Sequence, residues 1–175
     1  MSGTSPMTGT KPMTGSKHRV CVSRTIDAPA GQLFGLLVHA ANHPAIDGSG
    51  MVRESADQLV VGAVGDVFVM KMHHDEFGDY QMANHVVEFE PGQRITWEPV
   101  RHEGSQIENL DDAENRGYYL WGYELAPAGA GSTVVTETFD CSRSPEELRA
   151  AVKDGHGWID AMTASLENLD KLSRA

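Results

Sequence analysis

The stretch WIDAMTASLENLDKL, residues 158–172, decides the fold of this chain. Its apolar residues recur at spacings of three and four, which places them on one stripe of an α-helix. The opposite face is polar, and Glu167 and Lys171 form a favourable pair four residues apart. An apolar stripe of this length needs a large partner surface. We therefore expect a long C-terminal helix that lies across a sheet.

Most of the chain before this helix has the alternating pattern of β-strands. Glycine and proline turns separate the apolar segments at hairpin spacing, which indicates an antiparallel sheet rather than βαβ units. One helix interrupts the series, with Asp27 as a candidate cap, Pro29 at its first position and an end near Ala41. The predicted strands are 19–26, 51–54, 66–73, 80–89, 94–97, 118–125 and 133–140.

The remaining segments suggest one domain, residues 18–175, preceded by a tail. Residues 1–17 contain the sequence Pro-Met-Thr-Gly twice and are expected to be a disordered tail. Residues 101–117 are polar and acidic and predict a long loop, either a lid over a cavity or a solvated segment. Ser144 is a candidate cap for a second helix, which Gly155 and Gly157 should interrupt.

Composition excludes several classes of partner. The net charge of −11 argues against nucleic acid and anionic membranes, since both bind cationic surfaces. No apolar run approaches the ~20 residues of a membrane-spanning helix, and no signal peptide is evident, so we expect no membrane insertion and a cytoplasmic location. Cys21 and Cys141 are too few for a disulfide framework. A homodimer is compatible with the sequence.

No metal or cofactor is expected. His73, His74, Asp75 and Glu76 lie together, but adjacent strand residues point to opposite faces, and no second ligand pair follows at a suitable spacing. The remaining histidines in turns, among them His43, are expected to be exposed to solvent.

Five segments together resemble one known superfamily. They are 23–30 with Phe34, 84–92 with Ile95 and Trp97, 121–125, 131–136 and 165–169. Their order resembles that of the START-like, SRPBCC helix-grip superfamily, nearest its polyketide cyclase/dehydrase group, over residues 19–173. The resemblance implies an α+β fold, in which a curved antiparallel sheet of about seven strands wraps around the long C-terminal helix.

The superfamily uses one internal cavity for different activities, so the resemblance implies a site but not a function. The first hypothesis is the binding of a small, largely hydrophobic molecule between the sheet and the C-terminal helix, without catalysis. The second is a cyclase/dehydratase-like enzyme that uses acid/base chemistry. The third is a protein-interaction module like the Hsp90-ATPase activators, which would need an exposed apolar patch.

Three polar residues share the predicted inward face of the strands: Arg24, His85 and Glu137. Burial raises the pKa of an unpaired carboxyl group, which makes Glu137 a candidate general base, and His85 is a second candidate acid or base. The alternative for Glu137 is an ion pair with Arg24, because the first and last strands pair antiparallel in this superfamily.

The predicted ligand contacts are Arg24 together with aromatic residues and one methionine on the inward face. Tyrosine and tryptophan suit a cavity wall because each combines an apolar ring with a polar atom that can orient a ligand. The full predicted set is Arg24, Trp97, Tyr119, Trp121, Tyr123, Phe139, Trp158 and Met162.

Overall fold

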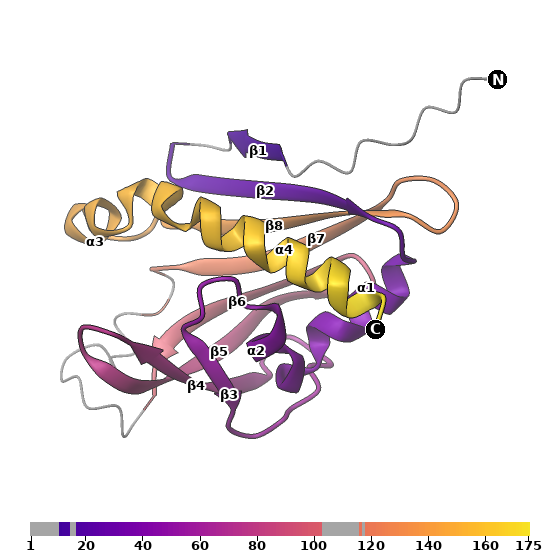
Figure 1. The fold of residues 1–175 in the computed structure, drawn as a ribbon. Helices are drawn as coiled ribbons and strands as arrows, with labels where there is room; N and C mark the ends of the chain where they lie inside the picture. Colours follow the sequence, from indigo (N-terminus) through magenta and orange to yellow (C-terminus); the bar gives the residue numbers. More distant parts are fainter. Residues whose placement is uncertain (1–10, 15–16, 103–115, 117) are drawn as a thin grey trace.

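The computed structural model describes residues 11–14, 17–102, 116 and 118–175. These residues form a curved antiparallel sheet of eight strands in the order β1-β2-β8-β7-β6-β5-β4-β3, with helix α4 lying across it (Figure 1). The strands are β1 (Lys11–Thr14), β2 (Arg19–Ile26), β3 (Val52–Ser55), β4 (Val67–His74), β5 (Gly78–Glu90), β6 (Arg94–Arg101), β7 (Leu120–Pro127) and β8 (Thr133–Asp140). The helices are α1 (Ala30–Val38), η1 (Ala40–Asn42), α2 (His43–Ile46), α3 (Glu146–Ala151), η3 (Lys153–Trp158) and α4 (Ile159–Ser173).

The fold prediction is confirmed: the architecture is a helix-grip α+β fold. Helix α4 begins and ends within one residue of the predicted range, and its buried face includes Met162, Leu166 and Leu169. The kink before it lies where glycines were predicted to interrupt the preceding helix, since Asp154 and Gly155 have φ angles of 54° and 90°. The apolar stripe therefore packs on the sheet, as its spacing requires.

The register between β2 and β8 sets the inner face of the sheet. Val20 lies opposite Phe139, Val22 opposite Glu137, and Arg24 opposite Val135. All five partners other than Arg24 are less than one tenth exposed, so the predicted inward face of these two strands is correct. Glu137 is thus buried on an apolar face.

A β-bulge between Val86 and Glu88 corrects the predicted face of β5. Val86 lies opposite Trp97, and Phe89 lies opposite Ile95. Val86 and Phe89 are three positions apart in the sequence, yet both face inward. An extra residue in one strand reverses the alternation beyond it. Counting back by twos from Phe89 therefore placed His85 on the wrong face, and the structure places it on the outer face opposite Glu98.

Two predicted helix caps serve other contacts. The Asp27 carboxylate accepts a hydrogen bond from Ser132 at 2.8 Å, and α1 begins after Pro29 without a side-chain cap. Ser144 donates to the carbonyl oxygen of Tyr118, and α3 begins after Pro145, also without a side-chain cap. Residues 40–46, expected to contain the end of the first helix and a turn, form η1 and α2.

The two segments expected to lack structure are only partly described. Residues 11–14 of the predicted tail form β1 beside β2, while residues 1–10 and 15–16 lie outside the described residues. Most of the predicted 101–117 loop, residues 103–115 and 117, also lies outside them. In the described part of the chain, the helices are too short or too polar to cross a membrane.

Candidate functional site

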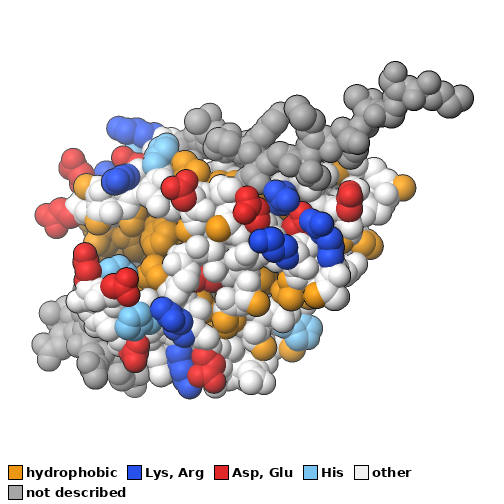
Figure 2. Space-filling view, in the orientation of Figure 1, with side chains coloured by type: hydrophobic (Ala, Val, Ile, Leu, Met, Phe, Trp, Pro, Cys, Tyr) orange, Lys and Arg blue, Asp and Glu red, His pale blue; other side chains and the backbone are white. Residues whose placement is uncertain are grey.

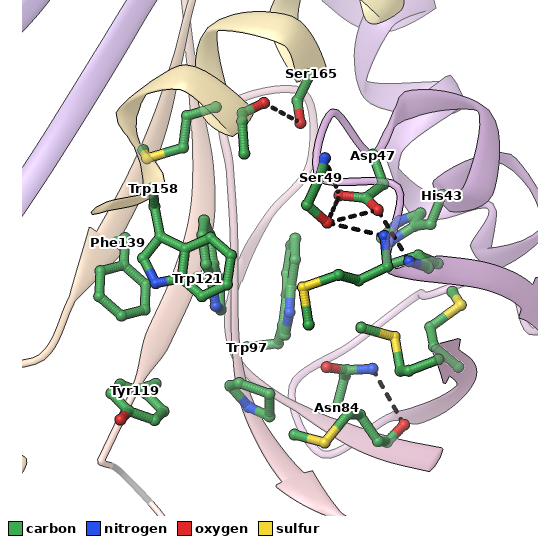
Figure 3. Close-up of a pocket in the computed structure, with 18 of the residues that line it drawn as sticks. His43, Asp47, Ser49, Asn84, Trp97, Tyr119, Trp121, Phe139, Trp158 and Ser165 are labelled. Atoms are coloured by element: carbon green, nitrogen blue, oxygen red, sulfur yellow. Dashed lines mark hydrogen bonds between the residues drawn. The ribbon is translucent and has the colours of Figure 1, made fainter. Parts of the chain in front are cut away.

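A cavity of about 410 Å³ lies between the sheet and α4 (Figure 3). Its inner wall comes from β6, β7 and β8, and α2 and the start of α4 close it from the other sides. Leu148 and Val152 near α3, and Phe77 and Tyr80 near the β4–β5 turn, also line it. Figure 2 shows an apolar hollow on the left of the molecule, in the region of α3 and this hairpin. Acidic side chains stand around that hollow.

One end of the cavity is an aromatic cluster from β7 and the residue before it, β8 and η3. Trp121 stacks obliquely on Phe139, with 4.6 Å between ring centroids, and lies edge-on to Trp158 at 5.5 Å. Tyr119 stacks on Phe139 at 5.5 Å. The alternation of β7 and β8 brings these rings to one face, so this wall is apolar but retains indole and phenol polar groups.

A second aromatic cluster lies toward α2. His43 contacts the rings of Phe68 and Trp97, with centroids 5.1 Å and 5.6 Å away. The Trp97 ring continues the wall to Tyr123, 6.0 Å away. Figure 3 shows His43 on the side of the cavity opposite Trp158.

Glu137 is the polar centre of the inner wall. The residue is 6% exposed, and its Oε2 atom has no hydrogen-bond partner among the residues described. Burial raises the pKa of this carboxyl well above its ordinary value, a hydrogen bond from Tyr123 lowers it in part, and the charge of Asp47 raises it further. Tyr123 lies directly opposite Glu137 on β7, and burial likewise raises the pKa of its hydroxyl. Burial therefore favours the protonated form of Glu137.

The protonation state of His43 follows from its surroundings. Its Nε2 atom lies 2.7 Å from the carbonyl oxygen of Leu37, which can only accept, so Nε2 carries the hydrogen. Burial lowers the pKa of the ring, which makes the neutral form dominant at pH 7. Nδ1 is then a hydrogen-bond acceptor, with no partner in the described part of the chain.

The loop after α2 is held against α4 by a close backbone approach. The Gly48 amide donates to the Ser165 hydroxyl at 2.8 Å, and a Cβ atom on Gly48 would lie 2.2 Å from the carbonyl oxygen of Ala161. Asp47 accepts hydrogen bonds from the Ser49 hydroxyl and from the backbone of Ser49 and Val52. These contacts fix the Asp47 carboxylate at the cavity wall.

Most of the predicted site residues line this cavity. They are Glu137, Trp97, Tyr119, Trp121, Tyr123, Phe139, Trp158 and Met162. Their roles remain predictions, but the structure brings their side chains to one space.

Arg24 and His85 are not among the lining residues. The Arg24 Nε donates to the Asp170 carboxylate on α4 at 2.9 Å, so the predicted ion pair between Arg24 and Glu137 is wrong. The register explains this, because Arg24 lies opposite Val135, two residues from Glu137. His85 lies on the outer face, where burial and Arg116 lower the pKa of its ring and Glu98 raises it.

The sequence analysis missed the polar residues of the α2 and β5 walls. His43 was expected in an exposed turn because Pro44 follows it, yet proline also suits the first turn of a helix. Asn84 lines the cavity with Tyr80 and Met82. Because these three residues alternate along β5, the two apolar ones could have indicated that Asn84 faces inward. Across the described residues, no group of three or more His, Cys, Asp or Glu side chains could hold a metal ion.

Sequence comparison identifies one informative relative. No model of a known protein family matches the chain. An uncharacterised protein of Mycobacterium tuberculosis is 30% identical over 123 residues, which is 68% of this chain. The match spans 46% of that relative, so this chain corresponds to about half its length.

Solved structures resemble the whole domain. A protein of Rhodobacter sphaeroides has a TM-score of 0.66 at 20% identity, over 94% of this chain and 97% of that one. An Arthrobacter aurescens protein has a TM-score of 0.68 at 11% identity, over 94% and 91%. The ZhuI aromatase/cyclase of a Streptomyces species has a TM-score of 0.60 at 13% identity, over 89% and 93%. The chain therefore has the helix-grip fold of the START-like, SRPBCC superfamily.

Proposed function

We propose that this protein binds a small, largely hydrophobic molecule in the cavity between the sheet and α4. The observation that carries the proposal is Glu137, a buried carboxyl group whose Oε2 atom has no described partner and which lines an aromatic cavity of about 410 Å³. An unpaired polar group in an apolar site costs stability, and a ligand would supply its missing hydrogen bond. Ligand sites are commonly apolar cavities with a few such polar groups.

The direct test is to look for a bound molecule. The purified protein is examined by native mass spectrometry and, after denaturation and solvent extraction, by small-molecule mass spectrometry. We expect an added mass that disappears on denaturation and reappears in the extract. Glu137→Gln keeps the shape of the wall and serves as the matched variant, which should carry less of the same molecule. A protein that carries no molecule and takes up none from a panel of uncharged aromatic compounds would refute the proposal.

A second candidate is a cyclase/dehydratase-like enzyme. The supporting observation is the juxtaposition of Tyr123 and Glu137 on the cavity wall. The ionised form of Glu137 could remove a proton next to a substrate carbonyl, while a tyrosine hydroxyl of the cavity lining would donate to the oxygen that becomes negative. The aromatase/cyclase with this fold adds analogy, but at 13% identity only for the fold. His85 has no part in this chemistry because it lies on the outer face.

The enzyme and carrier hypotheses differ in what happens to the bound molecule. For an enzyme, Glu137→Gln abolishes turnover without lowering the melting temperature, and Tyr123→Phe slows turnover. For a carrier, the molecule is recovered unchanged from the wild-type protein. Turnover that survives Glu137→Gln would exclude the acid/base role.

The structure gives less support to the third hypothesis, a protein-interaction module. A protein-interaction module needs a large apolar patch, whereas the large apolar side chains exposed among the described residues are Val60, Val64, Val67 and Phe77. The last of these stacks on His74, with ring centroids 4.2 Å apart. The cytoplasmic location and the homodimer remain predictions.

A further inference from the structure

Two buried polar atoms on the cavity wall have no hydrogen-bond partner among the described residues. They are Oε2 of Glu137 and Nε1 of Trp158, neither of which has a hydrogen bond to any residue that the structure describes. Both side chains line the cavity. The indole N–H of Trp158 can only donate. A bound molecule that satisfies Trp158 must therefore present an acceptor to it.

In its protonated form, the carboxyl group of Glu137 also donates a hydrogen bond. Its protonated form is favoured by burial and by the negative charge of Asp47. The cation described on the cavity wall is Arg101, whose guanidinium lies 5.3 Å and 4.8 Å from the ring centres of Phe77 and Tyr80. Those contacts place Arg101 at the β4–β5 hairpin. Tyr123 is hydrogen-bonded to the Glu137 carboxyl group, and Oε2 is the carboxyl oxygen without a described partner.

The side of the cavity opposite Trp158 presents acceptors. The Asn84 amide nitrogen donates to the carbonyl oxygens of Phe68 and Met82, at 3.1 Å and 3.4 Å. Because carbonyl oxygens only accept, this contact fixes the amide orientation and leaves Oδ1 as an acceptor without a described partner. Nδ1 of His43 is the second acceptor on this side. Figure 3 shows His43 and Asn84 across the cavity from Trp158.

Acidic side chains stand near the cavity, whereas its lining holds one described cation, Arg101. Asp75 and Asp79 on the β4–β5 hairpin have side chains 100% and 91% exposed, and Glu146 and Glu147 are exposed on α3. Asp47 adds a carboxylate to the lining. Acidic groups near an opening lower the local concentration of anions.

We infer that the ligand is an uncharged ring compound with a hydrogen-bond acceptor at one end and a hydroxyl or N–H donor at the other. This inference rests on the proposed function. The acceptor end contacts Glu137 and Trp158, and the donor end contacts His43 and Asn84. The aromatic walls between them hold the ring system.

A matched series of naphthalene probes tests whether the ligand needs an acceptor at one end and a donor at the other. 6-Acetyl-2-naphthol carries both groups, 2-acetylnaphthalene only the acceptor, 6-ethyl-2-naphthol only the donor, and 2-ethylnaphthalene neither. 6-Hydroxy-2-naphthoic acid supplies the anionic control. Dissociation constants are measured by isothermal titration calorimetry near pH 6.5. We expect the two-group probe to bind roughly threefold to tenfold more tightly than either one-group probe, and the acid to bind more weakly than the ketone.

Variants assign each end of the ligand. Trp158→Phe keeps a ring but removes the N–H, so it should weaken only the acetyl-bearing probes. His43→Phe should weaken only the hydroxyl-bearing probes, provided its melting temperature shows that it folds. Phe139→Leu removes ring area without a polar atom and is the matched control, which should weaken all the neutral probes alike.

The outcomes separate this inference from the proposed function. Equal affinity for all four neutral probes overturns the polarity and leaves hydrophobic binding in place. An acid that binds as tightly as the ketone overturns the uncharged class. In the wild-type protein, the acetyl and hydroxyl groups each strengthen binding relative to 2-ethylnaphthalene. If both gains in affinity are unchanged in Trp158→Phe and in His43→Phe, the assignment of the ends is wrong. If no probe binds and no molecule co-purifies, both the inference and the proposed function fail.

Discussion

Tyr123 and Glu137 lie directly opposite each other on β7 and β8, and both are buried on the cavity wall. Burial raises the pKa of each group, so the pair holds its protons to higher pH than either side chain does in water. The pairing of β7 with β8 therefore places two titratable groups side by side on the cavity wall. A ligand that contacts Glu137 therefore also changes the pKa of its carboxyl group.

The first prediction concerns the pH dependence of stability. The pKa of Glu137 is raised in the folded protein, so between its unfolded and folded pKa values the folded state binds more protons. Its contribution is fully present below the unfolded pKa, about 4.3, and is lost as pH rises. The free energy of unfolding should fall by about 1.4 kcal/mol per pH unit in this window. Glu137→Gln should remove this slope.

The measurement is urea unfolding from pH 4 to pH 8, taken as the difference between wild type and Glu137→Gln. The difference cancels the titration of other groups, including His43, whose pKa is shifted the opposite way. A difference that does not change with pH would mean that Glu137 has an ordinary pKa in the folded state.

The helix and the inner strands were predictable because their apolar residues follow one period without interruption. Val20, Val22, Val135 and Phe139 alternate regularly, and their faces follow from the sequence. In β5 the alternation breaks at the bulge after Val86. The pattern looks the same with or without an extra residue, so only pairing with β6 decides which residues face inward. The wrong face for His85 follows from this.

The polar lining of the cavity was hard to predict for another reason. His43 reaches the cavity because α2 is packed against α4 through Gly48 and Ser165. That contact joins residues 117 positions apart, and no local pattern encodes it. Arg24 had the predicted inward direction, but its partner is Asp170 on the helix rather than a residue of the neighbouring strand. Local periodicity determines a face and leaves the partner open.

The second prediction concerns that ion pair. The Asp170 side chain is 5% exposed and also accepts hydrogen bonds from Arg174. Arg24→Met would leave a buried carboxylate with one fewer cation, and we expect the free energy of unfolding to fall by about 2 to 3 kcal/mol. Chemical unfolding measures the change.

Double-mutant cycles distinguish the true partner of Arg24. Arg24→Met and Asp170→Asn should show a coupling energy of about 1 kcal/mol or more, since each removes part of the same contact. Arg24→Met and Glu137→Gln should be additive to within about 0.5 kcal/mol. Strong coupling in the second cycle would restore the ion pair with Glu137 that the register excludes.

The third prediction uses tryptophan fluorescence to locate the bound molecule. All three tryptophans of the chain, Trp97, Trp121 and Trp158, line the cavity. A probe bound there at about 100 times its dissociation constant should stabilise the protein by about 2.7 kcal/mol and change the tryptophan emission over the same concentration range. Stabilisation without any change in emission would place the bound probe elsewhere.

The fourth prediction concerns the close approach that positions α2 and Asp47. A Cβ atom on Gly48 would lie 2.2 Å from the Ala161 carbonyl oxygen and 2.6 Å from the Ser165 amide, both backbone atoms that cannot rotate away. Gly48→Ala should therefore lower the free energy of unfolding by about 1 to 3 kcal/mol. It should also weaken probe binding, because the loop that fixes one cavity wall must shift.

The matched control for Gly48→Ala is Gly35→Ala, in the middle of α1, where a Cβ atom would meet nothing within 4 Å. Alanine in a helix restricts the unfolded chain, so this variant should gain about 0.5 to 1 kcal/mol and leave probe affinity unchanged. Both variants add one methyl group, and only their surroundings differ. If Gly48→Ala were as stable as Gly35→Ala and bound probes equally well, α2 would not be held against α4 at Gly48, and the His43 side of the cavity would need another support.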